Sequence, residues 1–211
     1  AISDCSALEY LTIPGRVSTI EDYTFEGCIG LKEITLPVTI TSIGYRSFYG
    51  CSALQTLEVP FGVKSIGSYA FYGCSSLTSI TFPYGLTTIS SEAFYGCSKL
   101  TSLDIPSTVE SVGYGAFDAC GGLRNVTVSS DIDIDYTFGD SRRNISSLTL
   151  GEGVTRLPSL YNCSKLTTLS LPASLGRSEY QWQVSYDISQ CSSLTTISVA
   201  AGNPYYKVSG G

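Results

Sequence analysis

The sequence predicts a repeat solenoid, in which short turns of chain stack on one another with a parallel β-sheet along one side. The cysteines from Cys5 to Cys120 are separated by five equal intervals of 23 residues. A fixed period of this length is typical of repeat architectures. Apolar residues also recur at fixed offsets from each cysteine. Because one such unit cannot bury its own apolar side, neighbouring units must share a continuous core.

Each regular unit carries apolar residues at offsets +3, +6, +8, +12, +15 and +20 from its cysteine. In the third unit these are Leu54, Leu57, Val59, Val63, Ile66 and Phe71. The segment 57–59 alternates apolar, polar and apolar, which is the pattern of a short half-buried strand. Pro60 has no N–H to donate to a strand ladder and is expected to end the strand. Gly50 and Gly73 each precede a cysteine, where we expect the chain to turn.

The sequence divides the solenoid into regular 23-residue repeats over 1–120 and irregular repeats of the same solenoid over 121–211. The interval from Cys120 to Cys163 is 43 residues, enough for two units, and Arg142 falls where a cysteine is expected. The interval from Cys163 to Cys191 is 28 residues, with the extra residues placed within 177–186. Counting expected strands gives about nine units.

Residues 51–96 read CSALQTLEVPFGVKSIGSYAFYG followed by CSSLTSITFPYGLTTISSEAFYG. This pattern resembles the BspA-type leucine-rich repeat, and the resemblance extends over nearly the whole chain. It implies a right-handed leucine-rich-repeat superhelix with a parallel sheet on one side. It also implies an extracellular or cell-surface protein used in adhesion or in contact with a host or matrix. The resemblance brings no catalytic residues with it.

Composition argues against several classes of function. The chain has a net charge of -6 with only 12 lysines and arginines, which is atypical of a nucleic-acid-binding protein. No apolar run approaches the roughly 18 residues of a membrane span. The absence of histidine removes the commonest general base, leaving only cysteines expected to be buried and unactivated serines as nucleophiles. We therefore expect no enzyme activity and no cofactor, apart from the calcium considered below.

Offsets +5 and +7 are predicted to face outward from the sheet. The side chains at these offsets form a hydroxyl-rich surface interrupted by acids, and we expect a binding face comprising Tyr10, Glu33, Thr35, Thr56, Glu58, Ser79, Thr81, Ser102 and Asp104. The simplest alternative is a solvated sheet face that favours β-branched threonine. If it is instead a binding face, its partner is expected to be a protein or glycan at a cell surface or matrix, since solenoids present extended concave surfaces. Ice binding by ranked threonines is a third interpretation, which the acids argue against.

An aromatic row is predicted at Tyr49, Tyr72 and Tyr95, each of which follows the inward phenylalanine of its unit. Such a row either supplies contact area for a partner or only shields the phenylalanine beneath it. The cysteines also have two interpretations. A disulfide ladder between neighbouring turns is sterically possible, but stacked equivalents point the same way, which favours buried free thiols.

Asp131, Asp133 and Asp135 alternate with isoleucine. In an extended strand their carboxylates would lie on one side about 6.8 Å apart, where they could hold calcium through oxygen ligands. The alternative is a solvated acidic edge that discourages strand pairing. Candidate glycosylation sites are Asn125, Asn144 and Asn162, each in an N-x-S/T sequence.

The predicted function is that of an extracellular, non-catalytic binding or adhesion protein that uses the exposed face of the sheet. The alternative is a structural subunit of an extracellular filament that carries the glycosylation sites. Neither end of the chain shows the polar cap that solenoids usually need. Two expectations follow: either the mature protein is longer than this chain, or the open ends stack head to tail. A head-to-tail contact that does not close into a ring produces a filament.

Overall fold

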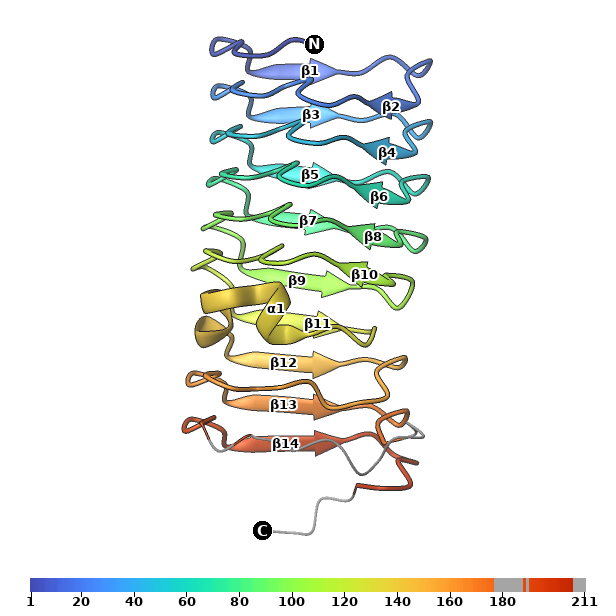
Figure 1. Ribbon diagram of the computed structural model, residues 1–211, viewed down its shortest axis with the longest axis vertical. Helices are drawn as coiled ribbons and strands as arrows, with labels where there is room; N and C mark the ends of the chain where they lie inside the picture. Colours follow the sequence, from blue (N-terminus) through green and yellow to red (C-terminus); the bar gives the residue numbers. More distant parts are fainter. Residues whose placement is uncertain (177–187, 189, 207–211) are drawn as a thin grey trace.

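In the part of the chain that the computed structural model describes (residues 1–176, 188 and 190–206), nine parallel strands stack along one side (Figure 1). They are β1 (Tyr10–Thr12), β3 (Glu33–Thr35), β5 (Thr56–Glu58), β7 (Ser79–Thr81), β9 (Ser102–Ile105), β11 (Asn125–Val128), β12 (Ser147–Leu150), β13 (Thr168–Leu171) and β14 (Thr196–Val199). The parallel solenoid predicted from the sequence is confirmed. The insertion predicted within 177–186 lies outside the described residues.

A second parallel sheet runs along another side of the solenoid. Its two-residue strands are β2 (Thr19–Ile20), β4 (Ser42–Ile43), β6 (Ser65–Ile66), β8 (Thr88–Ile89) and β10 (Ser111–Val112). The pairing is like on like, so that Ile43 lies beside Ile20 on one side and Ile66 on the other. Only five of the nine described turns carry this second strand, and all five fall within the regular repeats.

A column of stacked phenylalanines fills the core. The inward phenylalanine of each regular turn is buried, and its ring stacks on the next one along the axis with interplanar angles of 2° to 27°. The ring centroids of Phe48 and Phe71 are 4.9 Å apart, and those of Phe71 and Phe94 are 5.0 Å apart. Phe138 continues the column beyond Phe117 at 5.6 Å, although it comes from the irregular region. The core is therefore continuous across the change in sequence pattern.

The turn before each cysteine uses left-handed backbone. Gly27, Gly50, Gly73 and Gly96 have φ between 72° and 75° at this place. This conformation is easy for glycine and strained for residues with a Cβ atom. In the fifth turn the same place is held by Ala119, with φ of 56°. At this place the backbone demand and the residue type therefore disagree in Ala119 and, before Cys5, in Asp4. A second left-handed place in the repeats is held by Tyr23, Arg46, Tyr69 and Glu92.

The irregular region contains a helix where the sequence suggested an extended acidic run, so that expectation is wrong. Residues 134–138 form α1 (Ile134–Phe138), followed by the 3₁₀ helix η1 (Gly139–Asn144). Asp133 is the N-cap, and its carboxylate accepts a hydrogen bond from the backbone N–H of Tyr136 at 2.9 Å. Ile134 and Phe138, four residues apart, share the buried face of the helix. Capping and core burial together outweigh the strand-like alternation.

Arg142 occupies the place of the missing cysteine, and only 9% of its side chain is exposed. Its guanidinium pairs with Asp135 at 2.6 Å and donates to the carbonyl of Tyr161 at 2.9 Å and to that of Gly139. A buried charge is tolerated only when it is paired and hydrogen-bonded. Asp135 is thus the counter-ion of Arg142.

Replacing Ala119 by glycine should stabilise the protein by about 0.5–1 kcal/mol, because glycine removes the left-handed strain and returns only part of the gain as unfolded-chain entropy. The converse change, Gly96→Ala, should destabilise it by a similar amount, about 0.5–1 kcal/mol, because the added strain exceeds the gain from a less flexible unfolded chain. A Cβ at position 96 would lie 3.8 Å from its nearest neighbours, so packing does not confound the result. Urea unfolding measures both changes.

Gly121→Ala is the control, since its φ lies outside the left-handed range and a Cβ there meets no atom within 4 Å. Its unfolding midpoint should stay near that of the wild type. A shift of Ala119→Gly and Gly96→Ala in the same direction would contradict the explanation by backbone strain.

Candidate functional site

The sheet face carries the nine predicted binding-face residues on five consecutive strands, β1 to β9. In β3, β5 and β7 the residues alternate exposed, buried and exposed, so offsets +5 and +7 point to solvent as predicted. Equivalent positions lie side by side, with Thr56 beside Ser79 and Glu58 beside Thr81. We call this strip, from Tyr10 to Asp104, the acidic face. Along it the strands form three hydrogen-bonded groups, β1–β3, β5–β7 and the group that begins at β9.

The carboxylates of the acidic face are not neutralised by the protein itself. Glu33, Glu58 and Asp104 are exposed, and none of them forms an ion pair with any described residue. Lys32, the cation next to Glu33 in the chain, instead pairs with Glu9 at 2.8 Å. Beyond β9 the acids disappear from the face, since β11 and β12 present asparagine, threonine and serine. Negative charge is therefore concentrated on the N-terminal half of the surface.

An exposed apolar row that sequence reasoning missed borders the acidic face. Val38, Phe61 and Tyr84 occupy equivalent places in three consecutive turns, each directly after the proline that ends a strand, and they are 66%, 71% and 86% exposed. We call them the rim row. With Glu33 and Glu58 they line a groove of about 730 Å³. The available signal was an apolar residue after Pro37, Pro60 and Pro83, in a turn where a polar residue is usual.

The predicted aromatic row forms a stack on another part of the surface. The rings of Tyr49 and Tyr72 are parallel within 11° with centroids 4.9 Å apart, and those of Tyr72 and Tyr95 follow at 4.8 Å. All three side chains are half-buried in the turns that lead into the face strands. Each ring therefore offers mainly an edge and a hydroxyl to solvent, while its faces are occupied by its neighbours.

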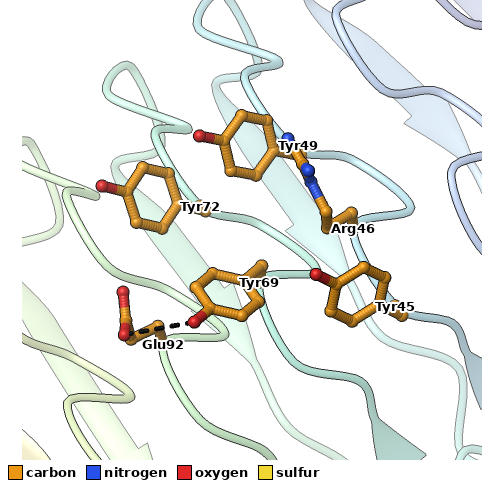
Figure 2. Close-up of a pocket in the computed structure, with 6 residues that line it drawn as sticks. All are labelled: Tyr45, Arg46, Tyr49, Tyr69, Tyr72 and Glu92. Carbon is orange, nitrogen blue, oxygen red and sulfur yellow. Dashed lines mark hydrogen bonds between the residues drawn. The ribbon is translucent and has the colours of Figure 1, made fainter.

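Next to this stack lies a small pocket whose polar groups already contact one another (Figure 2). The Arg46 guanidinium lies 4.0 Å from the centroid of the Tyr49 ring and pairs with Glu26 at 2.6 Å. The Tyr69 hydroxyl donates to Glu92 at 3.4 Å, and the negative charge of that carboxylate is the main cause that raises the pKa of Tyr69. With both charges engaged, this pocket has less to offer a ligand than the acidic face.

The cysteines from Cys5 to Cys163 are free thiols, and all but Cys5 are buried, as the stacking argument predicted. The structure adds a role that the sequence did not show. In the five regular turns from Cys28 to Cys120 the thiol donates to a backbone carbonyl one turn back, as from Cys51 to Phe25 at 3.2 Å and from Cys120 to Phe94 at 3.2 Å. Burial raises the pKa of Cys51 and of Cys163 to about 12. These thiols are protonated at neutral pH and are poor nucleophiles.

The aspartates proposed for calcium point to different partners. The Asp131 carboxylate accepts from the backbone N–H of Thr155 at 2.9 Å, while Asp133 caps α1 and Asp135 pairs with Arg142. The described residues contain no group of three or more acidic or cysteine side chains that could hold a metal ion. The three carboxylates therefore do not lie together on one side of a strand, as the calcium hypothesis required.

The three candidate glycosylation sites differ in exposure. Asn125 is exposed on β11, whereas Asn144 is half-buried and its side-chain oxygen accepts from Lys165 at 3.1 Å. Asn162 is half-buried in left-handed backbone with φ of 64°. Modification at these positions stays a prediction, and Asn125 is the site most accessible to it.

The sequence matches the family model described as "BspA type Leucine rich repeat region", with six copies over residues 1–124 and 87–203. The chain belongs to the BspA-type leucine-rich repeat family. A comparison with curated proteins gives no significant match. None of the helices in the described part of the chain has the length and apolar character needed to cross a bilayer.

Solved structures of bacterial leucine-rich repeat proteins share the fold. The T. pallidum leucine rich repeat protein is 26% identical with a TM-score of 0.60, over 77% of this chain and 69% of that one. A leucine-rich repeat protein from Bacteroides ovatus is 26% identical with a TM-score of 0.54, over 95% of this chain and 57% of that one. The pneumococcal vaccine antigen PcpA is 22% identical with a TM-score of 0.52, over 84% and 47%. The chain thus spans about half to two thirds of the length of these neighbours.

The raised thiol pKa values predict a loss of stability at alkaline pH. Unfolded thiols release their protons near the ordinary value of 9.0, whereas the folded Cys51 and Cys163 keep theirs up to about 12. The unfolded state therefore binds fewer protons above pH 9, and stability should fall as pH rises from 9 towards 12, by up to about 1.4 kcal/mol per pH unit for each thiol.

Urea unfolding of wild type and Cys51→Ala at pH 8.0, 9.5 and 10.5 separates this effect from tyrosine and lysine titration, which both proteins share. The variant should lose stability with pH less steeply, by about one thiol's contribution. Identical slopes for the two proteins would mean that Cys51 titrates normally in the folded state.

Proposed function

We propose that this BspA-family chain is a non-catalytic binding protein at the cell surface, and that it adheres to a protein partner through the acidic face. The observation that carries this is the continuous exposed strip from Tyr10 to Asp104 with three carboxylates left without an ion pair. Stacked strands give a solenoid an extended surface that can follow a partner over several turns. These three carboxylates face solvent and form no ion pair with any described residue.

We favour the acidic face over the small pocket beside the tyrosine stack, here called the tyrosine pocket, because its charged groups have no intramolecular ion pair. In the tyrosine pocket the charges of Arg46 and Glu92 already have intramolecular partners. A ligand there would have to replace existing contacts, which costs affinity. On the acidic face a partner would bind carboxylates that have no intramolecular ion pair, and its charge-assisted hydrogen bonds would replace only bonds to water.

The non-catalytic part of the proposal rests on the chemistry of the available side chains. The chain has no histidine, and burial holds the pKa of the core thiols above the ordinary value. Nucleophilic catalysis needs a lowered pKa or an adjacent general base. The surface and adhesive part is supported by family membership, since the sequence pattern resembles that of surface and secreted proteins.

A surface-immobilised wild-type chain, measured by biolayer interferometry against a panel of purified extracellular-matrix proteins and glycans, tests the proposal. Thr81→Arg places a bulky cation in the middle of the acidic face and should weaken any binding found by about tenfold or more, since substitutions at the centre of an interface cost the most. Ser111→Arg makes the same change at an exposed position on β10, outside the face, and should leave the affinity unchanged. Equal effects of the two substitutions, or no binding to any member of the panel, would contradict the assignment.

A further inference from the structure

We propose that the groove between the rim row and the acidic face takes a short, extended peptide segment that combines lysine or arginine with an aromatic or aliphatic side chain. The proposal rests on the acidic face being a protein-binding surface and names the chemistry that this surface would select. Its basis is the side-by-side placement of two features that are unusual on a free surface: largely exposed aromatic rings and carboxylates without an ion pair in the described chain.

The apolar half of the groove is built by repetition. Phe61 and Tyr84 follow the strand-ending prolines of consecutive turns, so their side chains should lie about 4.8 Å apart along the axis, the usual spacing of neighbouring strands. Beneath them, Val59 and Phe82 are buried in the core and fix the backbone that presents the rims. Large exposed apolar groups that cluster in this way mark interaction surfaces more often than isolated ones do.

The acidic half of the groove sets the sign of the partner's charge. Glu33 and Glu58 line the groove and have no ion pair in the described chain. Lys64 reaches the neighbouring turn at Gly85 but does not line the groove. Residues 1–120 carry 11 acidic and 5 basic residues, so the surrounding field is also negative. Carboxylates pair with cations, and aromatic faces attract the same cations, whereas an acidic segment would be repelled.

The dimensions of the groove fit a segment of only a few residues. It spans the ends of β3, β5 and β7, and two turn spacings amount to about 10 Å. An extended peptide lying along the axis covers that length with about three residues. Such a segment could place an apolar side chain against Phe61 or Tyr84 and a cation on either side of it, near Glu33 and Glu58. The arrangement therefore favours alternating cationic and apolar side chains over a run of either kind.

Isothermal titration calorimetry with three synthetic, acetylated and amidated peptides tests this proposal on the full chain. The probes are KFGKFGK, its acidic counterpart EFGEFGE and its non-aromatic counterpart KGGKGGK. We expect KFGKFGK to bind at least tenfold more tightly than either counterpart. Its affinity should fall several-fold between 50 and 300 mM salt, since exposed charge pairs are screened.

Matched substitutions locate the site. Phe61→Ser and Tyr84→Ser remove the rings, Glu58→Gln removes a charge, and each should weaken the binding of KFGKFGK by about fivefold or more. The controls are Ile29→Ser, an exposed apolar residue, and Glu110→Gln, an exposed acid, both outside the groove lining. They should bind as the wild type does. All five positions are exposed, and an unchanged thermal melt establishes that each variant is folded.

Three results would overturn the proposal. One is equal affinity of the wild type for KFGKFGK and EFGEFGE. Another is wild-type affinity for KFGKFGK in Phe61→Ser and Tyr84→Ser. The third is that a neutral glycan of the panel blocks binding of the matrix partner while KFGKFGK does not. Its failure is distinguishable from failure of the acidic face as a whole. If Ser102→Arg, on the acidic face but outside the groove lining, abolishes matrix binding while the rim variants retain it, the face binds its partner without the groove.

Discussion

The structure depends on one constraint: every residue of a regular turn must lie on its equivalent 23 residues further along the chain. Backbone hydrogen bonds enforce this register, as when the N–H of Phe48 donates to the carbonyl of Ala70 and that of Phe71 to Ala93, both at 2.7 Å. Once the register is set, phenylalanine stacks on phenylalanine and the thiols from Cys28 to Cys120 each donate to a carbonyl one turn back. Core packing, turn geometry and surface pattern all follow from the same translation.

The irregular region shows what the register demands when the period fails. Between Cys120 and Cys163 the chain must still supply an aromatic ring on top of Phe117, and it does so from a helix that brings Phe138 into place. The cysteine position is filled by Arg142, whose buried charge then needs Asp135 as its partner. The acidic residues that look like an exposed run in sequence are therefore committed to capping and charge pairing within the fold.

The sequence was sufficient to predict the solenoid, the outward offsets and the buried thiols, because these depend on apolar periodicity, which the core enforces in every unit. It was not sufficient for the helix at 134–138, where alternating Asp and Ile is equally compatible with a strand until the N-cap at Asp133 is known. It also missed the rim row and the contacts of Arg46. Exposed positions are not constrained by the core, and which of them end up in one groove depends on the path of the turns.

Repetition of equivalent side chains from turn to turn also explains how a chain with few charged residues can present a locally distinct surface. Equivalent side chains recur at about the strand spacing, so one residue type repeated in three turns makes a row, and two neighbouring rows make a groove. The rim row and the acidic face are such a pair, confined to turns whose register is undisturbed. Beyond β9 the face loses its acids, and the position that follows the proline is Ser107. Specificity is therefore expected to reside in a few adjacent turns, while the remaining units extend and stabilise the scaffold that presents them.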